Sequence, residues 1–290
     1  MWWRRSKKTD TITGTINRQQ FTFVQKGHVL SAAASELPRD PEEVNRQDFQ
    51  HYMFRYLLRA NVLAPVKYPL SVLDVGCGTG LWAKEVADQF PRANVMGVDI
   101  SPLARYKEEI APNFLFLQAN LLDGLPFAAN TFDYVHQRVL VLGIPSDKWV
   151  PVAQELARVT LPQGWIELAE PCYGFGAPAL ENMYAWMGTL ARMRHIDVGA
   201  VRFLGDYLKS AHLRNVRSHK IDIPVGEHGG RVGRWIATDI LAIFKGLRQP
   251  LIGAKITTEQ AFDAAFAAFQ SELWTHRGFI PYYVAYGQKA

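Results

Sequence analysis

The sequence predicts an α/β protein in which a mostly parallel sheet is covered by helices, with further helical segments on both sides of it in the chain. Three observations lead to this prediction. Short apolar segments alternate with helical ones between residues 70 and 170, a glycine turn follows the first apolar segment, and helices dominate after Pro171. Alternation of strand and helix builds a parallel sheet with helices on both faces.

The length of 290 residues, with 48% hydrophobic and 20% charged side chains, indicates one core domain with substantial additions. We divide the chain into an N-terminal extension with a helix (1–62), a core (63–175) and helical cap additions that also carry the last core strands (176–290). No apolar run reaches the ~18 residues that span a bilayer, so no membrane span is expected. Two cysteines and no apolar stretch after the basic start favour a reducing, cytoplasmic location.

The elements follow from local patterns. Residues 1–30 show little periodicity and are expected to be extended or loosely ordered. A helix is expected from Pro41, with Asp40 as its N-cap and acidic residues in its first turn. The core is expected to have strands at 71–75, 93–100, 113–118, 132–137 and 165–169, helices at 81–90, 102–110 and 147–160, and a turn at 163–164. The cap is expected to have helices at 178–194, 197–212, 233–247 and 258–276, and strands at about 216–223 and 279–286.

The most informative stretch is the turn after the first strand, Asp74-Val75-Gly76-Cys77-Gly78-Thr79-Gly80. A strand that enters a glycine turn and then a helix brings bare backbone and helix N–H groups against a ligand. A dehydrogenase fingerprint requires a glycine three residues after Gly78, where Leu81 stands. A phosphate-binding P-loop requires Gly-Lys-Ser/Thr, which is absent.

The turn resembles motif I of the class I S-adenosylmethionine (SAM) methyltransferases. Asp99 ends the second strand nineteen residues after Gly80, where an acid accepts hydrogen bonds from both ribose hydroxyls, although a nicotinamide enzyme uses the same acid. The segments 116–127, 132–138 and 161–167 continue the resemblance over about residues 70–170. In the first of them the family usually has an acid that holds the adenine amino group, and this chain has Asn120 there, whose amide oxygen can also accept. It implies a Rossmann-like sheet with an antiparallel last strand and SAM as cofactor. The residues implied for the cofactor are Asp74, Gly76, Cys77, Gly78, Gly80, Asp99, Ile100, Asn120, Leu121, Gln137 and Arg46.

A narrower resemblance extends to residues 20–175. The segment from Leu37 to His51, with Leu-Pro-x-Asp-x-x-Glu followed by Arg and His, is similar to the LaeA-like methyltransferases. In that reading the helix with Arg46 and His51 closes over the methionine end of SAM. The alternative is that Arg46 pairs with Glu42 at i, i+4 and that His51 lies on the surface.

Candidate catalytic residues are His136, Glu170, Tyr173 and His51, and we also considered Gln137, His195 and His228. A strand with alternating faces cannot direct both His136 and Gln137 into one pocket. No metal is expected. The methionine and aromatic clusters of the cap are more typical of a core than of a cofactor site, and the arginines of the cap could hold an acidic substrate group or be solvated.

We therefore expect a SAM-dependent methyltransferase that acts on oxygen or carbon of a small, largely apolar metabolite of secondary metabolism. The alternatives are an RNA or DNA methyltransferase and a non-catalytic SAM-binding regulator. The basic excess favours nucleic acid, but residues 63–171 contain eight Lys and Arg against twelve Asp and Glu, a net charge of −4. The core also lacks Asn/Asp-Pro-Pro-Tyr/Phe at the fourth strand. Nucleic acid is therefore not expected as a partner, and a homodimer is left open.

Overall fold

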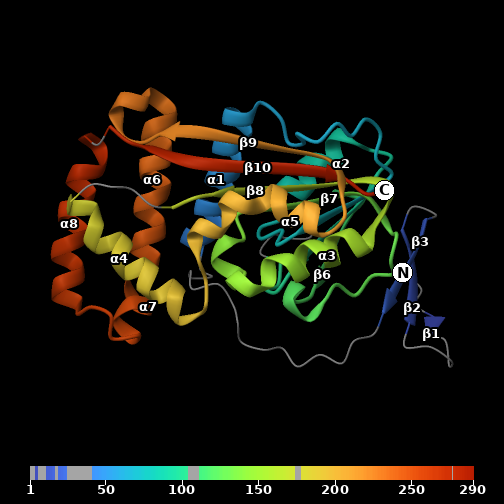
Figure 1. The fold of residues 1–290 in the computed structure, drawn as a ribbon, viewed down its shortest axis with the longest axis horizontal. Helices are drawn as coiled ribbons and strands as arrows, with labels where there is room; N and C mark the ends of the chain where they lie inside the picture. The colour runs from blue at the N-terminus through green and yellow to red at the C-terminus, as the bar shows by residue number, and fades with distance from the viewer. Residues whose placement is uncertain are drawn as a thin grey trace.

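The computed structural model describes residues 4–5, 11–16, 19–24, 41–103, 111–173, 178–275 and 277–290. A seven-stranded sheet forms the centre of this part of the chain, and a group of helices lies at one end of it (Figure 1). Within the same residues, every helix is too short or too polar to cross a bilayer.

The central sheet is mostly parallel. Its strands are β4 (Ser71–Val75), β5 (Asn94–Asp99), β6 (Phe114–Gln118), β7 (Phe132–Arg138), β8 (Thr160–Pro171), β9 (Arg214–Pro224) and β10 (Phe279–Gln288). They lie in the order β6-β5-β4-β7-β8-β10-β9, and β10 is antiparallel to both of its neighbours. The predicted sheet with an antiparallel last strand is thus confirmed. The strand order reverses between β4 and β7, and parallel sheets of this kind bind ligands at such a switch point.

The described residues contain eight α-helices. They are α1 (Pro41–Leu58), α2 (Leu81–Gln89), α3 (Trp149–Val159), α4 (Pro178–Met193), α5 (Leu204–Ser210), α6 (Gly230–Gly246), α7 (Arg248–Gly253) and α8 (Glu259–Thr275). Helix α2 contacts β5, whereas α3 contacts β8 and α5 contacts β9 and β10. Helices α4, α6, α7 and α8 form the group at one end of the sheet, on the left of Figure 1.

Both faces of the sheet pack against an apolar core. Successive side chains of a strand point to opposite faces, so neighbouring residues belong to different clusters. Val72 and its register partner Tyr134 belong to the smaller core cluster, which contains Trp82 of α2. The next pair, Leu73 and Val135, belongs to the larger cluster, which contains the apolar residues of α3. All four strand residues are fully buried. The near-continuous apolar strands of the sequence therefore reflect two packed faces.

The helical cap has a core of its own, as the clusters of aromatic residues predicted. The Tyr184 ring packs edge-on against Phe244 at 5.1 Å between centroids, and Phe244 lies 4.8 Å from Phe269. Phe244 and Phe269 are fully buried. Such ring pairs stabilise a core beyond the area they bury.

Two local expectations differ from the structure. The single helix expected at 197–212 is a 3₁₀ turn at Val198–Phe203 followed by α5, because the Asp197 carboxylate accepts from the Gly199 N–H and tightens the start. The turn expected at 163–164 lies inside β8, where Gln163 takes a φ of 65° and the β7–β8 register shifts. The first difference comes from a local hydrogen bond, whereas Gln163 and Gly164 exchange backbone hydrogen bonds with the distant Lys289.

The N-terminal residues were expected to be extended, and the described ones form strands. β1 (Arg4–Arg5), β2 (Thr11–Ile16) and β3 (Gln19–Val24) make a small antiparallel sheet, a pairing that the sequence did not predict. The N-cap expected at Asp40 and most of the helix expected at 102–110 lie outside the described residues. The division of the chain at residues 62 and 175 stays a prediction.

Candidate functional site

The glycine turn lies at the carboxyl end of β4, in the middle of the sheet. Gly76, Gly78 and Gly80 have φ values of 71°, 52° and 76°, in the left-handed region that favours glycine. The N–H groups of Gly76 and Cys77 both donate to the Val98 carbonyl at 2.7 and 3.1 Å, which holds the turn against β5. These bonds fix the turn at the carboxyl end of the sheet.

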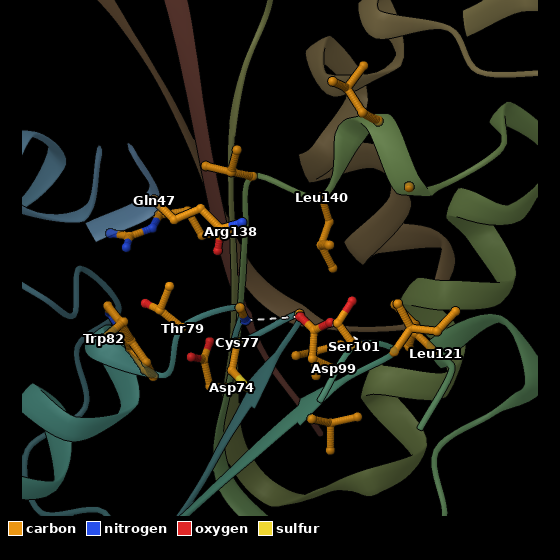
Figure 2. Close-up of a pocket in the computed structure, with 18 of the residues that line it drawn as sticks. Gln47, Asp74, Cys77, Thr79, Trp82, Asp99, Ser101, Leu121, Arg138 and Leu140 are labelled. Carbon is orange, nitrogen blue, oxygen red and sulfur yellow. Dashed lines mark hydrogen bonds between the residues drawn. The ribbon is translucent and has the colours of Figure 1, made fainter. Parts of the chain in front are cut away.

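Asp99 ends β5 directly beside this turn. Its Oδ2 accepts from the Gly78 N–H at 2.9 Å, drawn as the dashed line in Figure 2, and its Oδ1 accepts from the Ser101 N–H at 2.8 Å. These two bonds orient the carboxylate at the mouth of the turn, where Asp99 lines the cavity. Asp99 is thus a preset acceptor at the edge of the turn.

A cavity of about 430 Å³ lies above the turn, at the carboxyl ends of β4, β5 and β7 and under α1. Its volume is typical of a small-molecule site. Nine of the predicted cofactor residues line it: Asp74, Gly76, Cys77, Gly78, Asp99, Ile100, Asn120, Leu121 and Arg46. Three of the predicted catalytic residues also line it: His136, Tyr173 and His51. The structure therefore brings most of the predicted residues together.

Gly80, Gln137 and Glu170 do not line the cavity. Gly80 caps the start of α2, and a Cβ there would lie 2.9 Å from the Leu103 side chain. Gln137 is fully buried and alternates with His136, as the strand geometry predicted. None of the three can touch a ligand in this cavity without movement, although Gly80 still shapes the turn.

Glu170 has a different surrounding from the one expected of a base in the pocket. It is fully buried, and its two oxygens accept from the Leu140 N–H at 2.8 Å and the Val141 N–H at 3.1 Å. Burial raises the pKa of its carboxyl to about 8, and the two backbone bonds oppose that rise. Glu170 therefore fastens the segment after β7, which forms one wall of the cavity.

His136 is held by two contacts. Its Nδ1 donates to Asp74 Oδ1 at 2.8 Å, and its ring stacks on Trp82 at 3.7 Å between centroids with 7° between the planes. Both members of the pair are buried, and they join the neighbouring strands β4 and β7 at their register pair. Nε2 of His136 makes none of the described hydrogen bonds with protein.

His51 is buried rather than on the surface, with a side chain that is 3% exposed. Its Nδ1 lies 2.9 Å from Arg138 Nη2 and its Nε2 lies 3.0 Å from Glu85 Oε2. Because a guanidinium only donates, Nδ1 accepts and Nε2–H donates to Glu85. Burial and the Arg138 charge lower the pKa of His51 to about 4, so the ring is neutral at physiological pH.

Arg46 does not pair with Glu42, which instead bonds Lys245 on the surface. Its Nε and Nη2 donate to Glu43 at 2.8 Å each, and its Nη1 donates to Asp239 at 2.7 Å. The Arg46, Glu43 and Asp239 side chains are 7%, 6% and 3% exposed. The buried cluster fastens α1 to α6, and Gln50 adds a hydrogen bond to Asp239.

Asn120 stands where an acid was expected by resemblance. Its Oδ1 accepts from the Leu122 N–H at 3.1 Å and its Nδ2 donates to Asp123 at 3.1 Å, so it caps a short 3₁₀ turn at Leu121–Asp123. An amide oxygen has two lone pairs, and one remains for a donor in the cavity. Its predicted contact with the adenine amino group stays a prediction.

Several lining residues were not among the sequence predictions, and they include Gln47, Thr79, Trp82, Arg138 and Leu140. Arg138 follows His136 by two residues on β7, so the period-two pattern of a strand could have found it. Leu140 packs on Gly76, where a Cβ would lie 2.5 Å from its Cδ1. Gln47 lies over Gly78, and Thr79 donates to Asp48 at 2.6 Å, so α1 covers the turn.

The other residues considered for the site lie elsewhere. His195 and His228 are exposed and do not line the cavity. The cap arginines considered for an acidic substrate group do not line it either: Arg192, Arg194, Arg202, Arg231 and Arg234. Within the described residues, no group of three or more His, Cys, Asp or Glu side chains is arranged to hold a metal ion.

The methyltransferase domain family matches residues 72–164, which contain the glycine turn and Asp99. Methyltransferase str3 of Strobilurus tenacellus is 35% identical over 198 residues, which cover 65% of this chain and 69% of that protein. N-methyltransferase sirN of Leptosphaeria maculans is 26% identical over 269 residues, with coverages of 87% and 94%. The secondary metabolism regulator LAE1 of Cochliobolus heterostrophus is 26% identical over 243 residues, with coverages of 76% and 78%.

A solved structure has a similar fold. Phosphoethanolamine N-methyltransferase 2 of Haemonchus contortus, in complex with S-adenosyl-L-methionine, superposes with a TM-score of 0.54 at 18% sequence identity. The match covers 82% of this chain and 52% of that one, so the chain spans about half the length of that protein. The chain belongs to the class I SAM-dependent methyltransferases, in the LaeA-like group.

Proposed function

We propose that this protein transfers a methyl group from SAM to a small, largely apolar metabolite of secondary metabolism. The observation that carries the proposal is the mixed lining of one cavity. The glycine turn and the oriented Asp99 carboxylate line it together with a set of aliphatic side chains. These aliphatic residues are Leu140, Val141, Leu142, Ile144 and Ile243.

The polar residues of the lining suit the chemistry of SAM. When bound, SAM supplies an electrophilic methyl group on a sulfonium whose sulfur leaves as a neutral thioether. We assign the ribose hydroxyls to Asp99, because its oriented carboxylate lines the cavity at the end of β5. Ile100 and Leu121 would flank the adenine ring, and Asp74 would accept from the methionine ammonium. A Cβ on Gly76 would clash with the Leu140 side chain, and a Cβ on Gly78 would clash with Gln47. Glycine therefore lets these two side chains pack closely on the turn.

The aliphatic side chains of the lining would exclude water and hold the methyl acceptor in line with the sulfur–carbon bond of SAM. The nucleophile must come within ~3–3.5 Å of the methyl carbon, so positioning is the main contribution of the protein. Gly76 backbone and the wall after β7, which Glu170 fastens, would set that position.

Only one lining candidate can act as a general base in this arrangement. Both ring nitrogens of His51 are engaged by Arg138 and Glu85. Burial raises the pKa of Tyr173 well above its ordinary value, so its hydroxyl stays protonated and serves as a donor. Nδ1 of His136 donates to Asp74, and its other ring nitrogen, Nε2, makes none of the described hydrogen bonds. We assign the base role to His136 for hydroxyl acceptors; an acceptor that is already deprotonated needs none.

Asp99→Ala tests the cofactor end. We expect the affinity for SAM and for S-adenosylhomocysteine, measured by isothermal titration calorimetry, to fall at least tenfold, because two charge-assisted hydrogen bonds are lost. Asp88→Ala is the matched control, since Asp88 forms an exposed pair with Lys84 on α2 and does not line the cavity. Unchanged binding in Asp99→Ala would remove Asp99 from the ribose role.

Turnover is tested separately with SAM labelled in its methyl group and a panel of small apolar acceptors. Binding of SAM without transfer to any acceptor would favour the regulatory alternative. Tight binding of RNA or DNA that falls steeply with salt would favour a nucleic-acid methyltransferase. The two cysteines, both free and buried, agree with the cytoplasmic location that we propose.

A further inference from the structure

Two arginines line the cavity, and they differ in what they already hold. Among the described lining residues, Arg46 and Arg138 are the permanently charged cations, since the others include no lysine and His51 is neutral. A zwitterionic amino-acid group in this cavity needs one cation for its carboxylate. The question is which arginine has donors left for it.

Arg46 has its guanidinium edges occupied. Glu43 takes Nε and Nη2 in a bidentate pair, and Asp239 takes Nη1. Two acidic partners already exceed its single positive charge. Removing either partner to bind a ligand would leave a buried carboxylate without its cation, which is costly. Arg46 therefore has a structural role, because it links α1 to α6.

Arg138 has the opposite situation. Its Nη2 donates to the neutral His51 Nδ1, and its guanidinium lies 5.7 Å from the centre of the Phe54 ring. No described carboxylate forms an ion pair with it, although it is partly buried beside the cavity. A neutral acceptor and an aromatic face orient the fork without cancelling its charge.

The position of Arg138 fits the far end of the cofactor. Figure 2 shows Arg138, Thr79 and Trp82 on one side of the cavity, and Asp99 and Leu121 on the other. If the adenosine lies at Asp99 and Leu121, as proposed above, the methionine chain must extend towards the opposite side. Asp74 lies between the two groups and would take the ammonium.

We infer that Arg138, held by His51 and Phe54, binds the α-carboxylate of the methionine part of SAM, and that Arg46 does not. This inference rests on the proposed function, because it assumes that SAM occupies the cavity. It assigns the two charges of the amino-acid group to side chains on neighbouring strands: the ammonium to Asp74 on β4 and the carboxylate to Arg138 on β7. It also gives the buried His51 a role, as a positioning residue for Arg138.

The test compares three ligands by calorimetry: S-adenosylhomocysteine, its decarboxylated analogue, which keeps the amine, and methylthioadenosine, which lacks the whole amino-acid group. The wild-type protein should bind S-adenosylhomocysteine about 10- to 100-fold more tightly than the decarboxylated analogue. Arg138→Met should bind the two about equally and should bind methylthioadenosine as the wild type does. Arg138→Lys should keep part of the discrimination, since it retains the charge without the fork.

Arg55→Met is the matched control. Arg55 bonds the same Glu85 as His51 does, but its side chain is 51% exposed and outside the cavity, so this variant should discriminate like the wild type. Wild-type protein that binds S-adenosylhomocysteine and its decarboxylated analogue equally overturns the assignment, whether or not Arg138→Met folds. Full discrimination in Arg138→Met also overturns it. If wild-type protein binds none of the three ligands, the proposed function itself fails and the inference falls with it.

Discussion

The buried link between α1 and α6 makes Arg46→Met the most informative change for stability. Methionine keeps the length of the side chain and suits the apolar surroundings, but it removes the cation from two buried acids. Glu43 and Asp239, whose side chains are 6% and 3% exposed, would then face each other without it. Burial already raises the pKa of Asp239 while the Arg46 charge opposes that rise, so the variant would push this pKa further up.

The expected loss follows from the burial of all three groups. Breaking a buried ion pair by removing one partner costs about 3–5 kcal/mol of the free energy of unfolding. In a protein of this size, about 1 kcal/mol lowers the melting temperature by roughly 2–4 °C, so a fall of roughly 6–20 °C is expected. Asp239→Leu combined with Arg46→Met should cost less than the sum of the two single changes, because the double variant leaves fewer unpaired charges.

The assay is urea unfolding followed by tryptophan fluorescence for the wild type, Arg46→Met, Asp239→Leu and the double variant. Arg55→Met serves as the control, because its exposed pair with Glu85 should contribute about 1 kcal/mol or less. A loss below about 1 kcal/mol in Arg46→Met, or full additivity in the double variant, would refute the view that this cluster is a buried, coupled link.

Two further predictions concern pH, and both are measured as the urea midpoint against pH. The pKa of Glu170 is about 8 in the folded protein against 4.5 when unfolded, so its contribution to stability is full below 4.5 and is lost as the pH rises through 8. At about 1.4 kcal/mol per pKa unit this loss amounts to a few kcal/mol, and Glu170→Gln should abolish it; an unchanged slope in that variant would contradict the assignment. The pKa of His51 is about 4 against 6.5 when unfolded, so its contribution is present above 6.5 and is lost as the pH falls towards 4. Glutamine at this position can still accept from Arg138 and donate to Glu85. His51→Gln should therefore reduce the loss of stability between pH 6.5 and 4. An equally steep loss in this variant would show that other groups cause it.

The features that the sequence predicted well are those that depend on neighbouring residues. The turn from Gly76 to Gly80 needs left-handed backbone, which only glycine adopts readily, and Asp99 stands at the end of a clear apolar strand. The two-sided burial of β4, β5 and β7 also follows from their apolar runs. Patterns of neighbouring residues were thus enough to predict the sheet, the glycine turn and the position of Asp99.

The features that were missed depend on residues far apart in the chain. Arg46 was predicted to bind the cofactor, with a pairing to Glu42 one turn away as the alternative, but its partner Asp239 lies 193 residues further on and no local pattern joins them. The polar bonds of Glu170 to the segment after β7 come from strand pairing in three dimensions. Glu170 was therefore predicted as a base from its place after a strand, but in the structure it is a buried acceptor that holds the segment after β7.

The contacts of α1 also bear on how the protein is made. The helix leaves the ribosome before any strand of the central sheet, yet its Gln50 and Arg46 find Asp239 only after 189 and 193 further residues have been synthesised. Pairings of such long sequence separation are slow to form and leave earlier segments exposed meanwhile. The roof of the cofactor cavity is therefore completed near the end of synthesis, although it is encoded at the start. A nascent chain could shape the glycine turn early, but it would enclose a ligand only once α6 has docked.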